Sequence, residues 1–222
     1  MVLTFERQLW NRGLKQIAGI DEAGRGPLAG PVVAASVVFS PAFLEKEQNG
    51  ALSGLTDSKK LTPARREFYF KFLMSQREHV AVGIGFADVS EIDSLNILKA
   101  TNLAMIRALQ NLPFVPEYVL VDGLPVSDIS LSCTAIIGGD SKSLTIAAAS
   151  VIAKVVRDDY MLQLDKLYPE YGFRMHKGYG TFSHIQALFE FGPCPAHRRS
   201  FRPVRESMAI RTGTHRKTYS HR

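Results

Sequence analysis

The sequence has little cysteine and lacks the common nucleotide-binding motifs. Its two cysteines, Cys133 and Cys194, are too few for a disulfide framework, and neither belongs to a CxxC pair that could bind zinc. The GxxxxGK motif of phosphate-binding loops is absent, and Gly24, Gly26 and Gly30 do not have the spacing of GxGxxG. These absences speak against a disulfide-stabilised secreted domain and a nucleotide-cofactor enzyme. They favour a reducing, cytoplasmic setting.

The chain also lacks long apolar runs. A helix needs roughly 20 apolar residues to cross a bilayer, and even residues 144–156 are interrupted by Lys154. The first 13 residues contain three charged side chains, where a secretory signal has an unbroken apolar segment. We therefore expect a soluble protein with no membrane association.

Positive charge is concentrated at the C-terminal end. The net charge of the 222 residues is +6, from 27 basic and 21 acidic side chains, yet residues 1–195 contain 19 basic and 20 acidic ones. Residues 196–222 hold one acid, Glu206, and eight basic residues: Arg198, Arg199, Arg202, Arg205, Arg211, Arg216, Lys217 and Arg222. A basic end predicts a polyanionic partner, although it would equally suit solubility or an anionic membrane surface.

The length and the apolar pattern predict one α/β domain. With 45% hydrophobic residues in 222, two complete cores would each be unusually small. Apolar alternation and β-branched runs predict strands at residues 16–21, 32–39, 80–86, 118–121 and 134–137. Helical periodicity predicts helices at 63–77, from Ser94 to before Pro113, 143–167 and 183–191, with a polar loop at 41–55. Strands that alternate with helices in this way favour a mixed sheet covered by helices.

Acidic residues follow three of the predicted strands. Asp21 and Glu22 end the first strand, and Asp122 and Asp140 come after two later ones. Ligands bind beyond the carboxyl ends of strands in open α/β sheets, and four acids at one place repel one another unless a cation joins them. Oxygen ligands without Cys or His select Mg²⁺ or Mn²⁺. The alternative is that each acid is only a turn residue, as Asp before Gly often is.

Glu22 raises a geometric question. Neighbouring side chains of a strand point to opposite faces, so Asp21 and Glu22 cannot both face one site along a regular strand. Either the strand bends at Ala23-Gly24, or Glu22 contributes its backbone carbonyl. The sequence leaves both possibilities open.

A glycine-rich turn, Gly24-Arg25-Gly26, follows these acids directly. Glycines let a backbone approach a ligand closely, and arginine offers a forked donor for phosphate. Lys59 and Lys60 stand before a helix and could contact phosphates, or they could simply be solvated. The turn itself could also lack any ligand.

Seven motifs in order along the chain resemble the ribonuclease HII family, the type 2 ribonucleases H. They cover roughly residues 16–204, so the resemblance is far more specific than any single motif. The motifs are Gly19-Ile-Asp-Glu-Ala-Gly-Arg-Gly-Pro27, Thr56-Asp-Ser-Lys-Lys-Leu61, Leu120-Val-Asp-Gly123, Gly139-Asp140, Ala147-Ala-Ala-Ser-Val-Ile-Ala-Lys-Val155, His176-Lys-Gly-Tyr-Gly-Thr181 and His197-Arg-Arg-Ser-Phe201.

The resemblance implies a ribonuclease H-like fold, a mixed five-stranded sheet flanked by helices with a helical C-terminal extension. It implies a catalytic domain over residues 1–204 and a basic tail over 205–222. The family's acidic positions, which serve as catalytic and metal-binding residues, match Asp21, Glu22, Asp122 and Asp140. Its substrate-binding loop matches Gly24, Arg25 and Gly26, its junction-sensing tyrosine matches Tyr179, and we add Lys59 as a candidate phosphate contact. Gly138 departs from the lysine that many relatives have there. The related ribonuclease HIII has a different loop and an added N-terminal domain.

By this resemblance the protein is expected to be an endonuclease. A requirement for ribose in the cleaved strand would distinguish it from other nucleases of the same superfold. The protein would hydrolyse the RNA strand of RNA–DNA hybrids and cleave 5′ to ribonucleotides embedded in duplex DNA. Two Mg²⁺ or Mn²⁺ ions would assist, and the products would carry 5′-phosphate and 3′-hydroxyl ends. We expect a monomer whose partner is the nucleic acid. The alternatives are another nuclease or resolvase of the same superfold and a non-catalytic nucleic-acid binder.

Two other groups of residues have weaker interpretations. His176, His184 and His197 could suggest a metal site, but no thiol accompanies them and their spacing is loose. Lys154, Arg157 and Asp158 fall on one predicted helix, where they could anchor the groove or form a plain surface ion pair.

Overall fold

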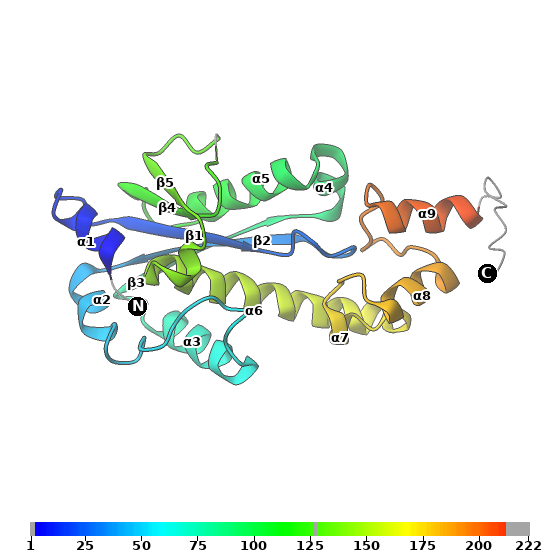
Figure 1. Ribbon diagram of the computed structural model, residues 1–222, viewed down its shortest axis with the longest axis horizontal. Coiled ribbons are helices and arrows are strands. Elements are labelled where there is room, and N and C mark those ends of the chain that lie inside the picture. The colour runs from blue at the N-terminus through cyan, green and yellow to red at the C-terminus, as the bar shows by residue number, and fades with distance from the viewer. Residues whose placement is uncertain (1–2, 127, 212–222) are drawn as a thin grey trace.

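A five-stranded mixed sheet forms the centre of the molecule (Figure 1). It is seen in a computed structural model, which describes residues 3–126 and 128–211. The strand order is β3-β2-β1-β4-β5, with β1 antiparallel to β2 and parallel to β4. The pair β2–β3 is antiparallel and the pair β4–β5 is parallel. The strands are β1 (Ile17–Ala23), β2 (Val32–Phe39), β3 (Val80–Ala87), β4 (Tyr118–Asp122) and β5 (Cys133–Ile136). The predicted mixed sheet is confirmed.

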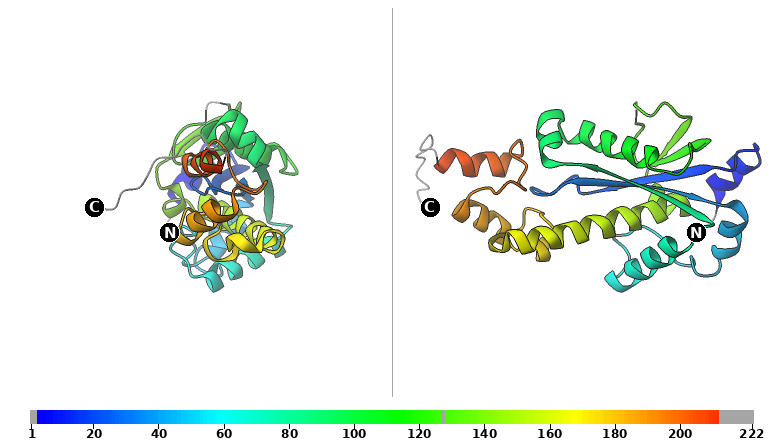
Figure 2. Two further views of the ribbon diagram at one scale, coloured as in Figure 1. Left: turned by 90° about the vertical axis from the view of Figure 1, so that its right-hand side faces the viewer. Right: turned by 180° about the vertical axis from the view of Figure 1, so that it is seen from behind.

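Helices cover both faces of the sheet (Figures 1 and 2). The long helix α6 and helix α3 pack on one face, and α4 and α5 cover the other. The helices are α1 (Thr4–Trp10), α2 (Pro41–Glu47), α3 (Pro63–Ser75), α4 (Val89–Leu95), α5 (Ile97–Gln110), η1 (Gly139–Ser141), α6 (Leu144–Leu167), η2 (Pro169–Tyr171), α7 (Phe173–His176), α8 (Phe182–Phe191) and α9 (Arg202–Arg211). Within the described residues, no helix combines the length and apolar character needed to cross a membrane.

The middle of the sheet is buried on both faces. All eight residues of β2 are buried, which fits its nearly continuous apolar sequence. In β1, Gly19 lies against the backbone of α6 at Thr145 and Ile146, where any side chain would overlap with those atoms. The close approach brings the carboxyl end of β1 beside α6.

Two predicted boundaries on the periphery were wrong. The expected loop at 41–55 contains α2, which begins with Pro41 at its first position, a favoured place for proline. The helix expected from Ser94 is two helices, α4 and α5, separated at Asn96, whose φ is +74°. A reciprocal pair of hydrogen bonds between Asp88 and Glu91 starts α4 earlier than the apolar periodicity indicated.

Helix α1 was not predicted from the sequence. Its buried Glu6 accepts hydrogen bonds from Ser143 Oγ at 2.6 Å and from the backbone N–H and the hydroxyl of Thr145 at 3.2 and 3.0 Å. Those donors belong to the first turn of α6 and the residue before it, where a carboxylate is favourable. A contact 137 residues away in sequence leaves no local signal.

The helical C-terminal extension is present at one end of the molecule, beyond the sheet (Figures 1 and 2). Helices α7, α8 and α9 follow α6 there. Helix α9 runs from Arg202 to Arg211, so the expected boundary between residues 204 and 205 falls inside it, and Val204 and Ser207 are both buried. Residues 212–222 of the expected basic tail lie outside the described residues.

Candidate active site

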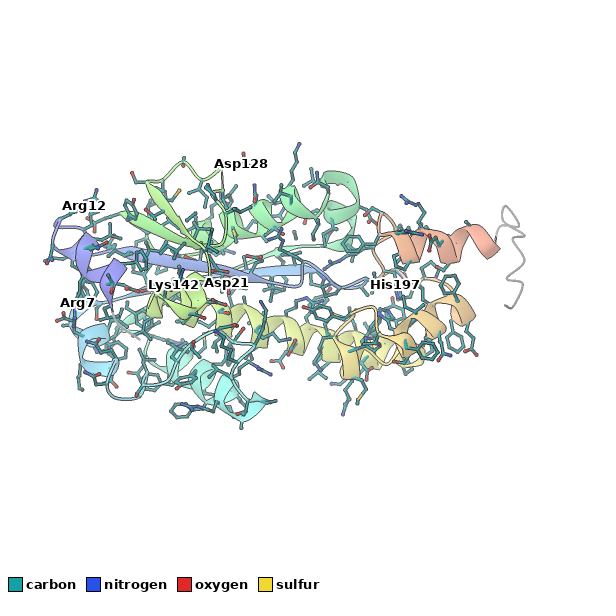
Figure 3. The ribbon with its side chains drawn as sticks, viewed as in Figure 1. Arg7, Arg12, Asp21, Asp128, Lys142 and His197 are labelled. Carbon is teal, nitrogen blue, oxygen red and sulfur yellow. The ribbon has the colours of Figure 1, made fainter. Side chains whose placement is uncertain are left out.

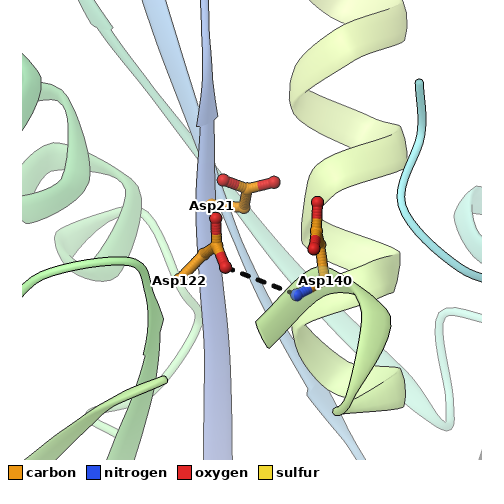
Figure 4. Close-up of side chains that lie close together, drawn as sticks. All are labelled: Asp21, Asp122 and Asp140. Atoms are coloured by element: carbon orange, nitrogen blue, oxygen red, sulfur yellow. Dashed lines mark hydrogen bonds between the residues drawn. The ribbon is translucent and has the colours of Figure 1, made fainter. Parts of the chain in front are cut away.

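Three aspartates come together where strands of the sheet end. Asp21 lies in β1, Asp122 is the last residue of the adjacent parallel strand β4, and Asp140 lies in η1 shortly after β5. Each offers a carboxylate oxygen, and these oxygens all lie within 4.8 Å of one another (Figure 4). The convergence follows from the parallel register, which carries the ends of β1, β4 and β5 to one edge.

Backbone hydrogen bonds fix the carboxylate of Asp122. Its Oδ1 accepts from the N–H of Gly139 at 2.6 Å and from that of Asp140 at 3.4 Å, the second of which is drawn in Figure 4. Gly139 has no room for a side chain, because a Cβ there would meet Ile146 Cδ1 at 2.6 Å. The turn between β5 and α6 is therefore held against β4 by an active-site acid.

The aspartates repel one another in a largely dry place. Burial raises the pKa of Asp21 well above its usual range, and the charges of Glu22 and Asp122 raise it further. Burial also raises the pKa of Asp140, with added contributions from Asp122 and Asp57. Clustered carboxylates with raised pKa values are typical of a cation site, since a bound cation would offset both costs.

Glu22 lies next to this cluster but is not part of the group of three. Its Oε1 pairs with Arg25 Nη1 at 3.4 Å, and burial raises its pKa more than Arg25 lowers it. Glu22 and Asp21 nevertheless line the same pocket.

A pocket of about 720 Å³ brings the other candidate residues to the acids. Its lining residues are Asp21, Glu22, Ala23, Gly24, Arg25, Gly26, Ser58, Lys59, Arg66, Ser150, Lys154, Arg157 and Tyr179. Tyr179 is half-exposed, and a Cβ added at Gly26 would lie 3.5 Å from its ring. The structure therefore places the glycine-rich loop and the tyrosine next to each other on the wall of the pocket.

Lys59 faces the acids across the pocket. Burial alone would lower its pKa, but the charges of Asp21, Asp57 and Asp140 outweigh that effect and raise it. A lysine held charged beside carboxylates and open space suits contact with a phosphate. Lys60 turns elsewhere, with its Nζ donating to Ser141 Oγ at 2.9 Å.

Sequence reasoning missed Asp57 and Ser150. The charge of Asp57 helps to raise the pKa of Asp140. Ser150, whose hydroxyl donates to Ser58 Oγ at 2.9 Å, lines the pocket with Asp21 and lowers the pKa of that acid. Both belong to motifs quoted above, the first before helix α3 and the second within α6. Only the approach of these helices to the sheet shows that they reach the site.

The three histidines do not form a metal site. Among the described residues they make no group with suitably placed ligand atoms; instead His184 Nε2 lies 3.0 Å from His197 Nε2, and the His176 ring stacks on His184. His197 lies toward the C-terminal helices, well away from Asp21 (Figure 3). Lys154, Arg157 and Asp158 on α6 do not form one group. Lys154 pairs with Asp158 at 2.7 Å, whereas Arg157 donates to the carbonyls of Pro31 and Ala29.

A family model described as Ribonuclease HII matches residues 18–204, which is most of the chain. The chain belongs to the ribonuclease HII family. Ribonuclease HII of Syntrophotalea carbinolica is 52% identical over 204 residues, covering 92% of this chain and 93% of the relative. Ribonuclease HII of Bacillus licheniformis is 50% identical over 202 residues, covering 91% of this chain and 75% of the relative.

Solved structures agree with this membership of the ribonuclease HII family. The ribonuclease H2 of Pyrococcus horikoshii OT3 is 27% identical, with a TM-score of 0.70 that covers 87% of this chain and 97% of that one. Bst-RNase HIII, solved in complex with Mn²⁺, has a TM-score of 0.62 at 19% identity, covering 90% of this chain and 71% of that one. The second likeness concerns the fold alone.

Proposed function

We propose that the protein is a ribonuclease H, an endonuclease that hydrolyses the RNA strand of RNA–DNA hybrids. It also cleaves duplex DNA 5′ to an embedded ribonucleotide, and its products carry 5′-phosphate and 3′-hydroxyl ends. The single observation that carries the proposal is the meeting of Asp21, Asp122 and Asp140 beside a pocket lined by Gly24–Gly26 and Tyr179. A protein that only bound nucleic acid would gain nothing from acids that repel phosphates.

Divalent ions fit the acidic cluster. Its donors are carboxylate oxygens only, without thiol or imidazole, and the pKa of both Asp21 and Asp140 is raised because their charges are buried together. Such donors suit Mg²⁺ or Mn²⁺. Asp21, Asp122 and Asp140, with Glu22 beside them, would hold two ions. Bound there, the ions would supply an activated water and neutralise charge on the leaving oxygen.

The other lining residues would position the substrate. Lys59 and Arg25 are cationic and would contact backbone phosphates. Gly26 presents backbone to the pocket beside Tyr179, and without a side chain there a sugar can approach the loop closely. Tyr179 would pack against the sugar that follows the ribonucleotide and favour a deoxyribose there, because a 2′-hydroxyl would crowd its ring.

The assay that tests the proposal compares three 5′-labelled duplexes with and without Mg²⁺. One carries a single ribonucleotide, one is an RNA–DNA hybrid and one is all-deoxy. We expect metal-dependent cleavage of the first two and none of the third. Cleavage of the all-deoxy duplex would point to another nuclease or resolvase of this fold, and binding without cleavage would point to a non-catalytic binder.

The expected domain limits, oligomeric state and setting belong to the same proposal. A catalytic domain over residues 1–204 with a basic tail over 205–222 would act as a monomer in the cytoplasm. Because α9 crosses that limit with Ser207 buried, a truncation should end after Arg211 instead of after Arg205.

A further inference from the structure

Arg198 is buried beneath the glycine-rich loop and donates only to backbone carbonyls among the described residues. Its Nε and Nη2 donate to Gly30 O at 2.9 and 2.8 Å, Nη2 donates to Gly24 O at 2.6 Å, and Nη1 donates to Arg25 O at 2.9 Å. Its relative exposure is 0%, and burial lowers its pKa to about 9, which still leaves it charged at neutral pH. A buried cation is tolerated only when its donors are satisfied, and here the loop satisfies them.

Residues 196–198 are themselves fixed against the loop's far end. The N–H of Arg198 donates to Leu28 O at 2.8 Å, and the N–H of Gly30 donates to Ala196 O at 2.8 Å. Ala29 and His197 form an antiparallel bridge between these two segments. The guanidinium therefore reaches Gly24 and Arg25 from a rigid base.

The geometry of the peptide bond shows in which direction the N–H groups of the glycine-rich loop point. In a trans peptide the C=O and the N–H point in opposite directions, and the described chain has no cis bond. The carbonyls of Gly24 and Arg25 point to the buried Arg198, so the N–H groups of Arg25 and Gly26 point the other way. Within the described residues neither N–H has a backbone acceptor, and both residues line the pocket.

We propose that Arg198 is a positioning residue for ribose recognition, because it turns the N–H groups of Arg25 and Gly26 into the pocket as paired donors to the ribose 2′-oxygen. The inference rests on the proposed function and adds that the loop donates hydrogen bonds to the ribose instead of accepting them. The loop carbonyls are engaged by Arg198, so the loop reads an acceptor oxygen, which deoxyribose lacks. His197-Arg198, at the start of a motif far from the acids, thereby acquires a role.

The test measures binding in the absence of divalent metal, so that no strand is cut. The dissociation constant is measured by fluorescence anisotropy for a duplex with one ribonucleotide and for the matching all-deoxy duplex. Arg198→Lys keeps the charge but replaces the planar fork of three nitrogens with a single nitrogen, which cannot reproduce the contacts of Nε, Nη1 and Nη2. We expect the preference for the ribonucleotide to fall about tenfold, the value of one or two hydrogen bonds. Binding of the all-deoxy duplex should change less than about twofold. Arg199→Lys, at the exposed neighbouring position, is the control and should keep the full preference.

A second measurement uses the wild-type chain and does not depend on how Arg198→Lys folds. The amide proton resonances of Arg25 and Gly26 should shift downfield with the ribonucleotide duplex and not with the all-deoxy one. Equal shifts with both duplexes, or a full ribonucleotide preference in a folded Arg198→Lys, would overturn the role of Arg198. A wild-type protein without any ribonucleotide preference would instead overturn the proposed function.

Discussion

The acidic side of the pocket and its loop side differ in what holds their polar groups. Asp21, Asp122 and Asp140 are like charges forced together by strand register, so the fold destabilises them and a cation would relieve the strain. On the loop side, Arg198 and Arg157 are buried cations whose donors are satisfied by backbone carbonyls. The acidic side therefore lowers the free energy of unfolding but provides the groups for metal binding. The loop side stabilises the fold and also orients the groups that would select ribose.

The largest effect should follow from Asp21→Asn. The variant keeps the shape but removes a charge that would hold metal, and we expect cleavage to fall at least about a thousandfold, equal to several kcal/mol. The free energy of unfolding should rise by about 1 kcal/mol at pH 7, because a carboxyl whose pKa is raised by folding is destabilising once ionised. Single-turnover kinetics and thermal melts check both results.

Asp122→Asn and Asp140→Asn should lose cleavage in the same way, with hybrid binding retained. Asp158→Asn, which only breaks a pair with Lys154, is the matched control and should cleave normally. Full turnover by Asp21→Asn, or a marked loss of its thermal stability, would break the contrast between the two sides.

Two buried histidines, His184 and His197, should make the free energy of unfolding depend on pH; His197 directly precedes Arg198, so we count the pair with the loop side. Burial lowers the pKa of His184 to about 4 and that of His197 to about 3, so both are neutral when folded and bind protons when unfolded below pH 6.5. Stability is then complete above pH 6.5 and decreases as the pH falls, by about 2 kcal/mol per histidine between pH 6.5 and pH 5. Urea unfolding at several pH values measures this slope.

The control for that slope is His79→Gln, since His79 is exposed. It should leave the pH dependence unchanged, whereas His184→Gln should reduce it and lower stability at pH 7. An unchanged slope in His184→Gln would show that the histidine pair does not stabilise the loop side.

Two glycines of the loop should separate stability from selectivity. Gly24 has a φ of +99° and its Cβ would overlap with Arg157, so Gly24→Ala should lower the free energy of unfolding by about 3 kcal/mol. A Cβ at Gly26 meets only the Tyr179 ring at an ordinary 3.5 Å, so Gly26→Ala should fold normally and lose ribonucleotide binding. Thermal melts and anisotropy measure the two effects. Normal ribonucleotide binding by Gly26→Ala would show that the glycine-rich loop does not recognise the ribose.

Tyr179→Ala should weaken cleavage at a single embedded ribonucleotide by roughly tenfold to thirtyfold, the value of one lost stacking contact. The ring is 45% exposed, so stability should change little. Metal-induced stabilisation should remain, because the acids are untouched. Tyr160→Ala, another partly exposed tyrosine, is the control. Equal effects of the two substitutions on cleavage would make Tyr179 only a wall of the groove.

Removal of residues 212–222 should have the smallest effect. This segment carries three basic residues, Arg216, Lys217 and Arg222, which would attract phosphates without regard to sequence. We expect KM to rise about threefold at moderate salt, with kcat unchanged and a smaller salt dependence. Steady-state kinetics at two salt concentrations tests this, and a loss of kcat would mean that the segment supports the catalytic domain.

The sequence by itself determined much of the fold and the acidic side of the site. Strand periodicity located β1 to β5 within a few residues, and the acids at their ends follow from local patterns that survive folding. The elements that periodicity missed are α1, α2, α7, α9 and the break between α4 and α5. Some of them depend on caps or on distant partners, such as the contact of Glu6 with Ser143. Such partners leave no periodic signal.

Only the tertiary structure decided how the loop side is built. Arg198 and Gly24 are 174 residues apart, and the use of a buried arginine on carbonyls cannot be read from composition or spacing. The histidines looked like loose metal ligands in the sequence, but in the fold His184 hydrogen-bonds to His197 and His176 stacks on His184. The physical reason is that charge and periodicity are local properties, whereas the satisfaction of a buried donor depends on which backbone the packing brings to it.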